Sequence, residues 1–249
     1  MSGPLRLLPG GVGGLWSYAT STPPGAPLTG HVVLCHDLPR AKGSASDVAH
    51  TYPALADRLT RETGWRAVAG TLRGAGESAG DFSAQGWLDD LALVIDTEVP
   101  ADAPRWLVGF GFGGVLALHL AATDARIAGV ACLGTPATLD SLTSDPLALV
   151  DRCVRSGIIR SAGYPGNPDT WAKEFLIFHP KEDAGLLKGR PLLVVHGSDD
   201  PSIPVDDARV LADAATGPAD LRVVYGAGHW LRADPRVIAL LVGWLERRR

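Results

Sequence analysis

The feature of this sequence that most limits its fold is a regular alternation of short apolar runs with segments of helical periodicity. The run 31–36 (HVVLCH) is typical of a strand buried on both faces of a sheet, and residues 45–63 then carry apolar side chains at helical spacing. The same alternation predicts strands at 65–71, 105–110, 127–133, 191–196 and 221–225, and helices at 86–98, 112–122, 205–216 and 234–247. Strands that alternate with helices form right-handed β-α-β units. We therefore expect an α/β fold with a mostly parallel central sheet and helices on both faces.

One long segment interrupts this alternation. Between residues 137 and 190, helical stretches at 146–156 and 169–178 are separated by Gly/Pro breaks such as 163–166. We expect this segment to be a small helical cap over the C-terminal edge of the sheet. It would be an insertion in a single domain that spans residues 1–249 and has one further strand at 15–20.

Charge and composition exclude several classes of function. Lys and Arg number 23 against 27 Asp and Glu, which gives a formal net charge of −4 and makes nucleic acid an unexpected partner. No stretch approaches eighteen uninterrupted apolar residues, and no secretory signal is recognisable at the N-terminus, so we expect a cytoplasmic protein that does not contact membranes. Cys35, Cys132 and Cys153 lack metal-ligand spacing and are predicted to be free, mostly buried thiols. We expect neither a metal nor a cofactor.

A glycine-rich turn follows the predicted strand at 105–110. The sequence Gly-Phe-Gly-Phe-Gly-Gly, residues 109–114, leads directly into an apolar helix. This is the strand-turn-helix setting of the nucleophile elbow G-x-S-x-G, in which a serine stands at the middle position. Here that position holds Gly111. The side chain that would attack a substrate is absent.

Two further strand ends supply an acid and a histidine. Asp200 follows the strand at 191–196 and is predicted, rather than Asp199, to be the acid, while His229 follows the strand at 221–225. Because ligands bind at the carboxyl ends of parallel strands, the elbow, Asp200 and His229 should meet at one edge of the sheet. Their order along the chain is the order elbow, acid, histidine of this fold.

A third strand end adds an oxyanion hole and a pocket. The backbone N–H groups of Leu38 and Phe112 are expected to face each other across the elbow as oxyanion donors. Asp37 precedes Leu38, and we expect its carboxylate to point to solvent, because a negative charge would oppose an oxyanion. The aromatic side chains of Trp171 and Trp230 are candidates for the lining of a ligand pocket.

With these residues in view, the chain resembles the α/β-hydrolase superfamily from about residue 31 to 249, and most of all its cap-bearing esterase and peptidase-like branch. The loop 72–83 is similar to that family's R-G-x-G-x-S loop. The resemblance implies a serine nucleophile at position 111, where this chain has glycine. It also implies a His-Gly pair where this chain has His36-Asp37.

Three functions are compatible with this pattern. The first is a pseudohydrolase that binds a small, partly apolar ligand or a protein partner. The second is a hydrolase or lyase that uses the Asp200-His229 dyad without a covalent intermediate. The third is a serine esterase inactivated by substitution at Gly111, or one whose nucleophile comes from Ser44, Ser46 or Ser78.

Overall fold

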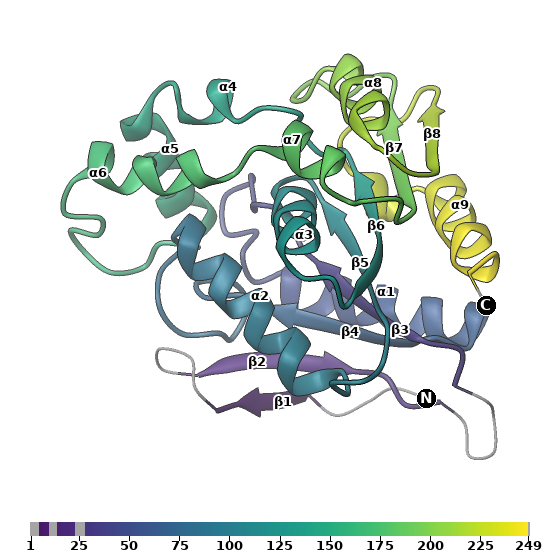
Figure 1. Cartoon of the computed structure of the whole chain (residues 1–249). Helices are drawn as coiled ribbons and strands as arrows, with labels where there is room; N and C mark the ends of the chain where they lie inside the picture. The colour runs from purple at the N-terminus through teal and green to yellow at the C-terminus, as the bar shows by residue number, and fades with distance from the viewer. Residues whose placement is uncertain (1–4, 10–13, 23–27, 249) are drawn as a thin grey trace.

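The computed structural model describes residues 5–9, 14–22 and 28–248, and within these residues the strands form one eight-stranded sheet (Figure 1). Its order is β1-β2-β4-β3-β5-β6-β7-β8. The strands are β1 (Leu5–Leu8), β2 (Leu15–Ala19), β3 (His31–Cys35), β4 (Arg66–Thr71), β5 (Arg105–Phe110), β6 (Ile127–Leu133), β7 (Leu192–Gly197) and β8 (Ala219–Val224). All neighbouring pairs from β4 to β8 are parallel. The predicted parallel α/β sheet is therefore confirmed.

The antiparallel edge contains a strand that the sequence pattern did not predict. β2 pairs antiparallel with both β4 and β1. β1 has only four residues, and Leu5 and Leu7 are largely exposed. A short strand at the edge of a sheet lacks the continuous apolar run by which a buried strand is recognised.

Helices cover both faces of the sheet. The long ones are α1 (Val48–Thr63), α2 (Ala84–Glu98), α3 (Phe112–Thr123), α8 (Val205–Ala214) and α9 (Pro235–Glu246). One apolar cluster joins the sheet to α1 and α9 through Leu59 and Trp244. The other joins it to α2, α3 and α8 through Leu91, Leu116 and Leu211. The mostly apolar α3 is buried along nearly its whole length, which holds the turn before it in a fixed position.

Short helices fill the segment 137–190, which we call the insertion. They are α4 (Asp140–Thr143), α5 (Pro146–Ser156), α6 (Pro168–Ala172), the 3-10 helix η1 (Lys173–Ile177) and α7 (Pro180–Gly185). Figure 1 shows α4, α5 and α6 grouped on one side of the molecule. α7 packs against α3 and α8 instead. A second 3-10 helix, η2 (Leu231–Ala233), precedes α9.

Two features that the described residues lack bear on function. Within 5–9, 14–22 and 28–248, no helix combines the length and the apolar character that crossing a bilayer requires. Over the same ranges, no three His, Cys, Asp or Glu side chains are grouped so that they could hold a metal ion. Cys35, Cys132 and Cys153 are buried free thiols, as predicted.

Candidate active site

Gly111 keeps the backbone of a nucleophile elbow. It lies between β5 and α3 with φ +50° and ψ −120°, in a region that glycine enters at little cost and other residues enter under strain. The turn is also tightly packed, because a Cβ on Gly113 would lie 2.3 Å from the carbonyl oxygen of Cys35. The shape of the elbow has therefore been retained while its side chain is missing.

The structure brings the predicted acid and histidine together. His229 Nδ1–H donates to Asp200 Oδ2 at 2.7 Å, and the Asp200 side chain is only 1% exposed. Asp200 Oδ1 accepts the backbone N–H groups of Ser202 and Ile203. Asp199 is exposed, and its carboxylate accepts the Ser198 hydroxyl instead. The geometry fits the prediction of Asp200, and the catalytic role of the pair stays a prediction.

The prediction that Asp37 points to solvent is wrong. Its carboxylate faces into the site, where Oδ1 accepts the Phe112 N–H at 2.8 Å and Oδ2 accepts His229 Nε2–H at 2.9 Å. A Cβ on Gly111 would lie 2.0 Å from Asp37 Oδ1. The Asp37 carboxylate thus occupies the space that a side chain on residue 111 would need. It also holds the two partners, an oxyanion donor and the histidine, that a serine-based site would use.

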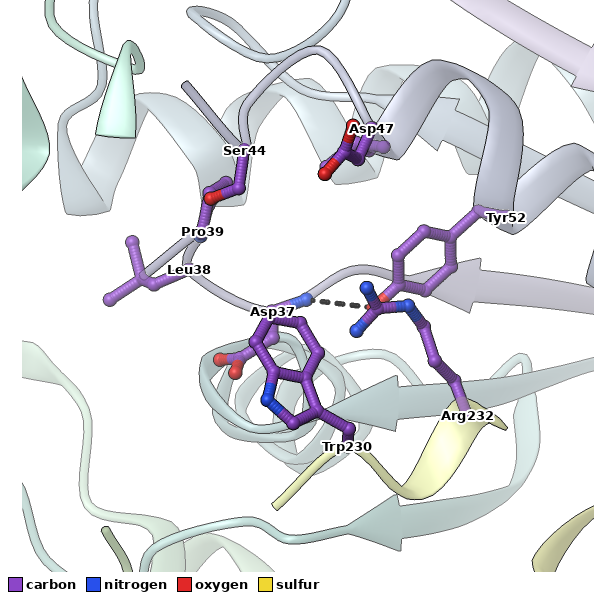
Figure 2. Close-up of a pocket in the computed structure, with 9 residues that line it drawn as sticks. Asp37, Leu38, Pro39, Ser44, Asp47, Tyr52, Trp230 and Arg232 are labelled. Carbon is purple, nitrogen blue, oxygen red and sulfur yellow. Dashed lines mark hydrogen bonds between the residues drawn. The ribbon is translucent and has the colours of Figure 1, made fainter. Parts of the chain in front are cut away.

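The inward direction of Asp37 is fixed by the backbone of its loop. Tyr52 Oη accepts the Asp37 N–H at 3.2 Å, the interaction drawn as a dashed line in Figure 2. His36 Nδ1–H donates to the Asp37 carbonyl oxygen at 3.0 Å, and His36 Nε2 accepts the Leu72 N–H at 3.1 Å. Burial lowers the pKa of His36 to about 4, so this histidine is neutral and acts as a structural support of the loop.

His229 lies between two carboxylates and is charged at neutral pH. Burial alone would lower its pKa, but hydrogen bonds to Asp200 and Asp37 outweigh that effect and raise the pKa to about 9. Both ring nitrogens face carboxylate oxygens, as expected of an imidazolium with two N–H donors. Burial would likewise raise the pKa of both aspartates, yet their bonds to His229 and to backbone N–H groups hold it below the usual range. The three side chains form a buried carboxylate-imidazolium-carboxylate cluster.

This cluster predicts how stability depends on pH. The folded state raises the pKa of His229 from 6.5 to about 9, so its contribution to the free energy of unfolding is complete below pH 6.5 and is lost as the pH rises through 9. The expected loss is about 3 kcal/mol. Urea unfolding at pH 6 to 10 measures it, with His229→Gln, which cannot titrate, as the control. Identical pH profiles for the two proteins would contradict the prediction.

The predicted pocket residues divide into two groups. Leu38 and the half-exposed Trp230 lie beside Asp37 around a small cavity of about 20 Å³, and the Arg232 guanidinium stacks on the Trp230 ring at 4.6 Å (Figure 2). Trp171 lies elsewhere. It is buried in the insertion, where its indole N–H donates to the Phe82 carbonyl oxygen at 3.3 Å. Aromatic packing against Phe82 and Phe175, rather than a ligand, accounts for that tryptophan.

A larger cavity opens above the cluster. Its volume is about 340 Å³, and we call it the Asp37 cavity. Its lining comes from the β3–α1 loop, the start of α3, the turn after β6, the insertion, the β7–α8 loop and the first turn of α8: Asp37, Leu38, Arg40, Phe112, Pro136, Thr138, Ser141, Leu142, Arg152, Ser202, Ile203, Pro204 and Asp207. The prediction from sequence did not include Arg40 or Arg152. Neither arginine belongs to a motif, and only the fold places them on this cavity.

The three serines considered as relocated nucleophiles are bound to backbone instead. Ser44 and Ser46 donate to the carbonyl oxygens of Ala41 and Gly43. Ser78 is fully buried and donates to the Thr71 carbonyl oxygen. His229 bonds to none of them, since both of its ring nitrogens are taken by Asp37 and Asp200. The geometry therefore disfavours a nucleophile at any of these serines.

Comparisons with solved structures identify the fold. The sequence matches no protein-family model and no curated protein. In structure, the chain is similar to α/β hydrolase domain-containing protein 10 from mouse, with a TM-score of 0.71, 18% identity and 98% of each chain covered. It is also similar to a monoacylglycerol lipase from Paleococcus ferrophilus (TM-score 0.67, 18% identity, 94% of this chain and 99% of that chain). A thermophilic esterase from Thermogutta terrifontis, with malate bound, gives a TM-score of 0.66 at 20% identity over 98% of each chain. This chain has the α/β-hydrolase fold.

Proposed function

We propose that this chain is a pseudohydrolase, a binding protein in which the acyl-transfer site of the hydrolase fold is filled by the chain's own Asp37 carboxylate. The observation that carries the proposal is the position of that carboxylate. It is bonded to the Phe112 N–H and to His229, and it lies within 2.0 Å of where a Cβ of residue 111 would be. The oxyanion donor and the histidine are both occupied before any substrate arrives.

Magnitudes support a loss of serine-type catalysis. In a serine hydrolase, removal of the nucleophile alone costs about 2 × 10⁶ in kcat. Here the remaining parts are also disabled. The Phe112 N–H is bonded to a carboxylate that repels a developing oxyanion. His229 already carries the proton that a general base would have to accept.

A dyad enzyme without a covalent step is less well supported for the same reason. With a pKa of about 9, only about one His229 in a hundred is neutral at pH 7. Its Nε2 faces Asp37 rather than open space where a water molecule could be activated. Asp200 and His229 are therefore better explained as partners that keep each other and Asp37 buried and charged.

The Asp37 cavity favours a small molecule over a protein as the bound partner. A concave site of about 340 Å³ lies in the range of ligand pockets. The insertion contributes Ser141, Leu142 and Arg152 to its wall, as a cap over the sheet would. The apolar residues Leu38, Phe112 and Ile203 on the same wall suit a partly apolar ligand.

A second candidate is an enzyme with Asp37 as its nucleophile. Carboxylates form covalent intermediates in several enzyme classes. The Asp37 side chain lines the cavity and is 15% exposed, so it could reach an electrophilic carbon there. An epoxide would suit such a site, since the carboxylate oxygen would bond to carbon, the ring C–O bond would break, and protonated His229 could supply the proton to the new alkoxide.

One experiment separates these functions. The protein is incubated with a fluorophosphonate probe, with styrene oxide and with p-nitrophenyl acetate and butyrate, and is followed by intact mass and by absorbance. We expect no covalent adduct with the fluorophosphonate or with styrene oxide. We also expect the protein and its His229→Gln variant to hydrolyse the p-nitrophenyl esters at rates that agree within about twofold. A phosphonylated serine, or ester turnover that disappears in His229→Gln, would overturn the proposal. A styrene oxide adduct that is linked to Asp37 through an ester bond would favour the second candidate instead.

A further inference from the structure

Two arginines line the Asp37 cavity. Arg40 follows β3, and its Nε lies 3.7 Å from Asp37 Oδ2. Arg152 comes from α5 in the insertion and is partly buried. Among the described residues, Arg152 has no hydrogen-bond or ion-pair partner. Burial lowers its pKa, as expected of a cation that has lost water without gaining a counterion.

The carboxylates on the cavity do not neutralise both arginines. Asp37 is the carboxylate that acts on Arg152, but Asp37 shares the charge of His229 with Asp200, and Arg40 at 3.7 Å supplies the second positive charge that these two carboxylates need. Asp207, from α8, also lines the cavity, and its carboxylate accepts the Ala137 N–H at 3.0 Å. Among the described residues, no cationic side chain lies within 4 Å of this carboxylate. The wall that Arg152 contributes therefore has an excess of positive charge, and the wall that Asp207 contributes is negative.

We propose that the Asp37 cavity binds a small organic monocarboxylate, with its carboxylate on Arg152 and Arg40 and its apolar part against Leu142 and Ile203. This inference rests on the proposed function, because both use the same cavity. Arginine is suited to the carboxylate, which it binds through two parallel N–H donors. Asp207 disfavours a dicarboxylate that would reach across the cavity, since a second negative charge would face it.

A matched series of ligands tests the charge requirement. Isothermal titration calorimetry compares butanoate, hexanoate, octanoate and 3-phenylpropanoate with their primary amides, which have nearly the same shape and no charge. We expect at least one acid of the series to bind about tenfold or more tightly than its amide, because hydrogen bonds to charged groups contribute that much or more. Hexanedioate, the dicarboxylate of matching length, is expected to bind more weakly than hexanoate.

Two arginines on the same helix provide the variant and its control. Arg152→Gln is expected to abolish the preference for acid over amide. Arg155→Gln removes an exposed arginine of α5 that pairs with Asp151 and does not line the cavity, and it should leave the preference unchanged.

Each other outcome has a distinct meaning. Equal binding of acids and amides would overturn the assigned ligand class and leave the binding function standing. A preference for acids that persists in Arg152→Gln and in Arg40→Gln would overturn the assigned site. If neither series binds, both this inference and the proposed small-molecule function fail.

Discussion

Replacing Asp37 by glycine and Gly111 by serine together is expected to create an active serine esterase, whereas Gly111→Ser alone is not. In the single variant, the serine Cβ would lie 2.0 Å from Asp37 Oδ1, so either the carboxylate or the elbow must move. The backbone at φ +50° adds strain for any residue other than glycine. We expect Gly111→Ser to destabilise the fold by about 1–3 kcal/mol and to remain inactive.

The double variant removes the obstruction as it adds the nucleophile. Glycine at position 37 frees the Phe112 N–H for an oxyanion and leaves His229 with Asp200 as its sole carboxylate partner among the described residues. The pKa of His229 should then fall, which returns it to the range of a general base. Turnover of p-nitrophenyl butyrate is expected to rise at least about 10³-fold over the starting protein.

A variant of matched size isolates the effect of the Asp37 side chain. Asp37→Asn with Gly111→Ser keeps the volume at position 37 and should stay unlabelled by a fluorophosphonate probe, while Asp37→Gly with Gly111→Ser is labelled on the new serine. Labelling of Gly111→Ser at the rate of the double variant would show that the Asp37 carboxylate does not obstruct the site. Addition of His229→Ala to the double variant should abolish turnover.

Sequence reasoning succeeded where an inference depended on local pattern and on topology. The positions of Asp200 and His229 follow from where parallel strands end, and these ends meet at one edge of any such sheet. The glycine turn at position 111 was likewise recognisable, because its backbone geometry is specified within a few residues.

The direction of the Asp37 side chain could not be predicted in this way. It depends on Tyr52, on Phe112 and on His229, which lie 15, 75 and 192 residues further along the chain. An isolated carboxylate prefers solvent. Here the Phe112 N–H and His229 are two buried donors that hold the Asp37 carboxylate inside the site instead. One signal was present in the sequence. The resemblance implies glycine at 37 and serine at 111, and this chain has its side chain at 37 and its glycine at 111.

The same long-range dependence explains the other differences. Trp171 lies 89 residues from Phe82, whose carbonyl oxygen accepts its indole N–H, and nothing near Trp171 in the sequence distinguishes a core side chain from a pocket side chain. Arg152 lies on a helix whose neighbouring arginine, Arg155, is an ordinary exposed residue paired with Asp151. Only the packing of α5 against the rest of the fold distinguishes the two.

Replacing His229 by alanine is expected to destabilise the protein by about 3–5 kcal/mol, a large loss for a single substitution. The change leaves Asp200 and Asp37 without the cation that they share, and removing one partner of a buried ion pair costs this much. Urea unfolding at pH 7 measures the loss. Combining His229→Ala with Asp37→Asn removes one of the two carboxylates that have lost His229. The double variant should therefore recover part of the lost free energy of unfolding.

The pH dependence of His229→Ala shows whether charge, rather than packing, is lost. Without His229, burial should raise the pKa of Asp200 and Asp37 above their unfolded values, so this variant should gain stability as the pH falls from 7 to 5. In the starting protein the folded-state His229 is protonated throughout that range, so its contribution changes only as the unfolded-state histidine titrates near pH 6.5, by less than about 1 kcal/mol. A loss below about 1 kcal/mol, or parallel pH profiles, would contradict an ion cluster.

A large loss would mean that these three groups stabilise the fold, whereas functional sites commonly reduce stability in favour of a reaction. That is the outcome expected if Asp37, His229 and Asp200 are retained for structure and binding instead of turnover.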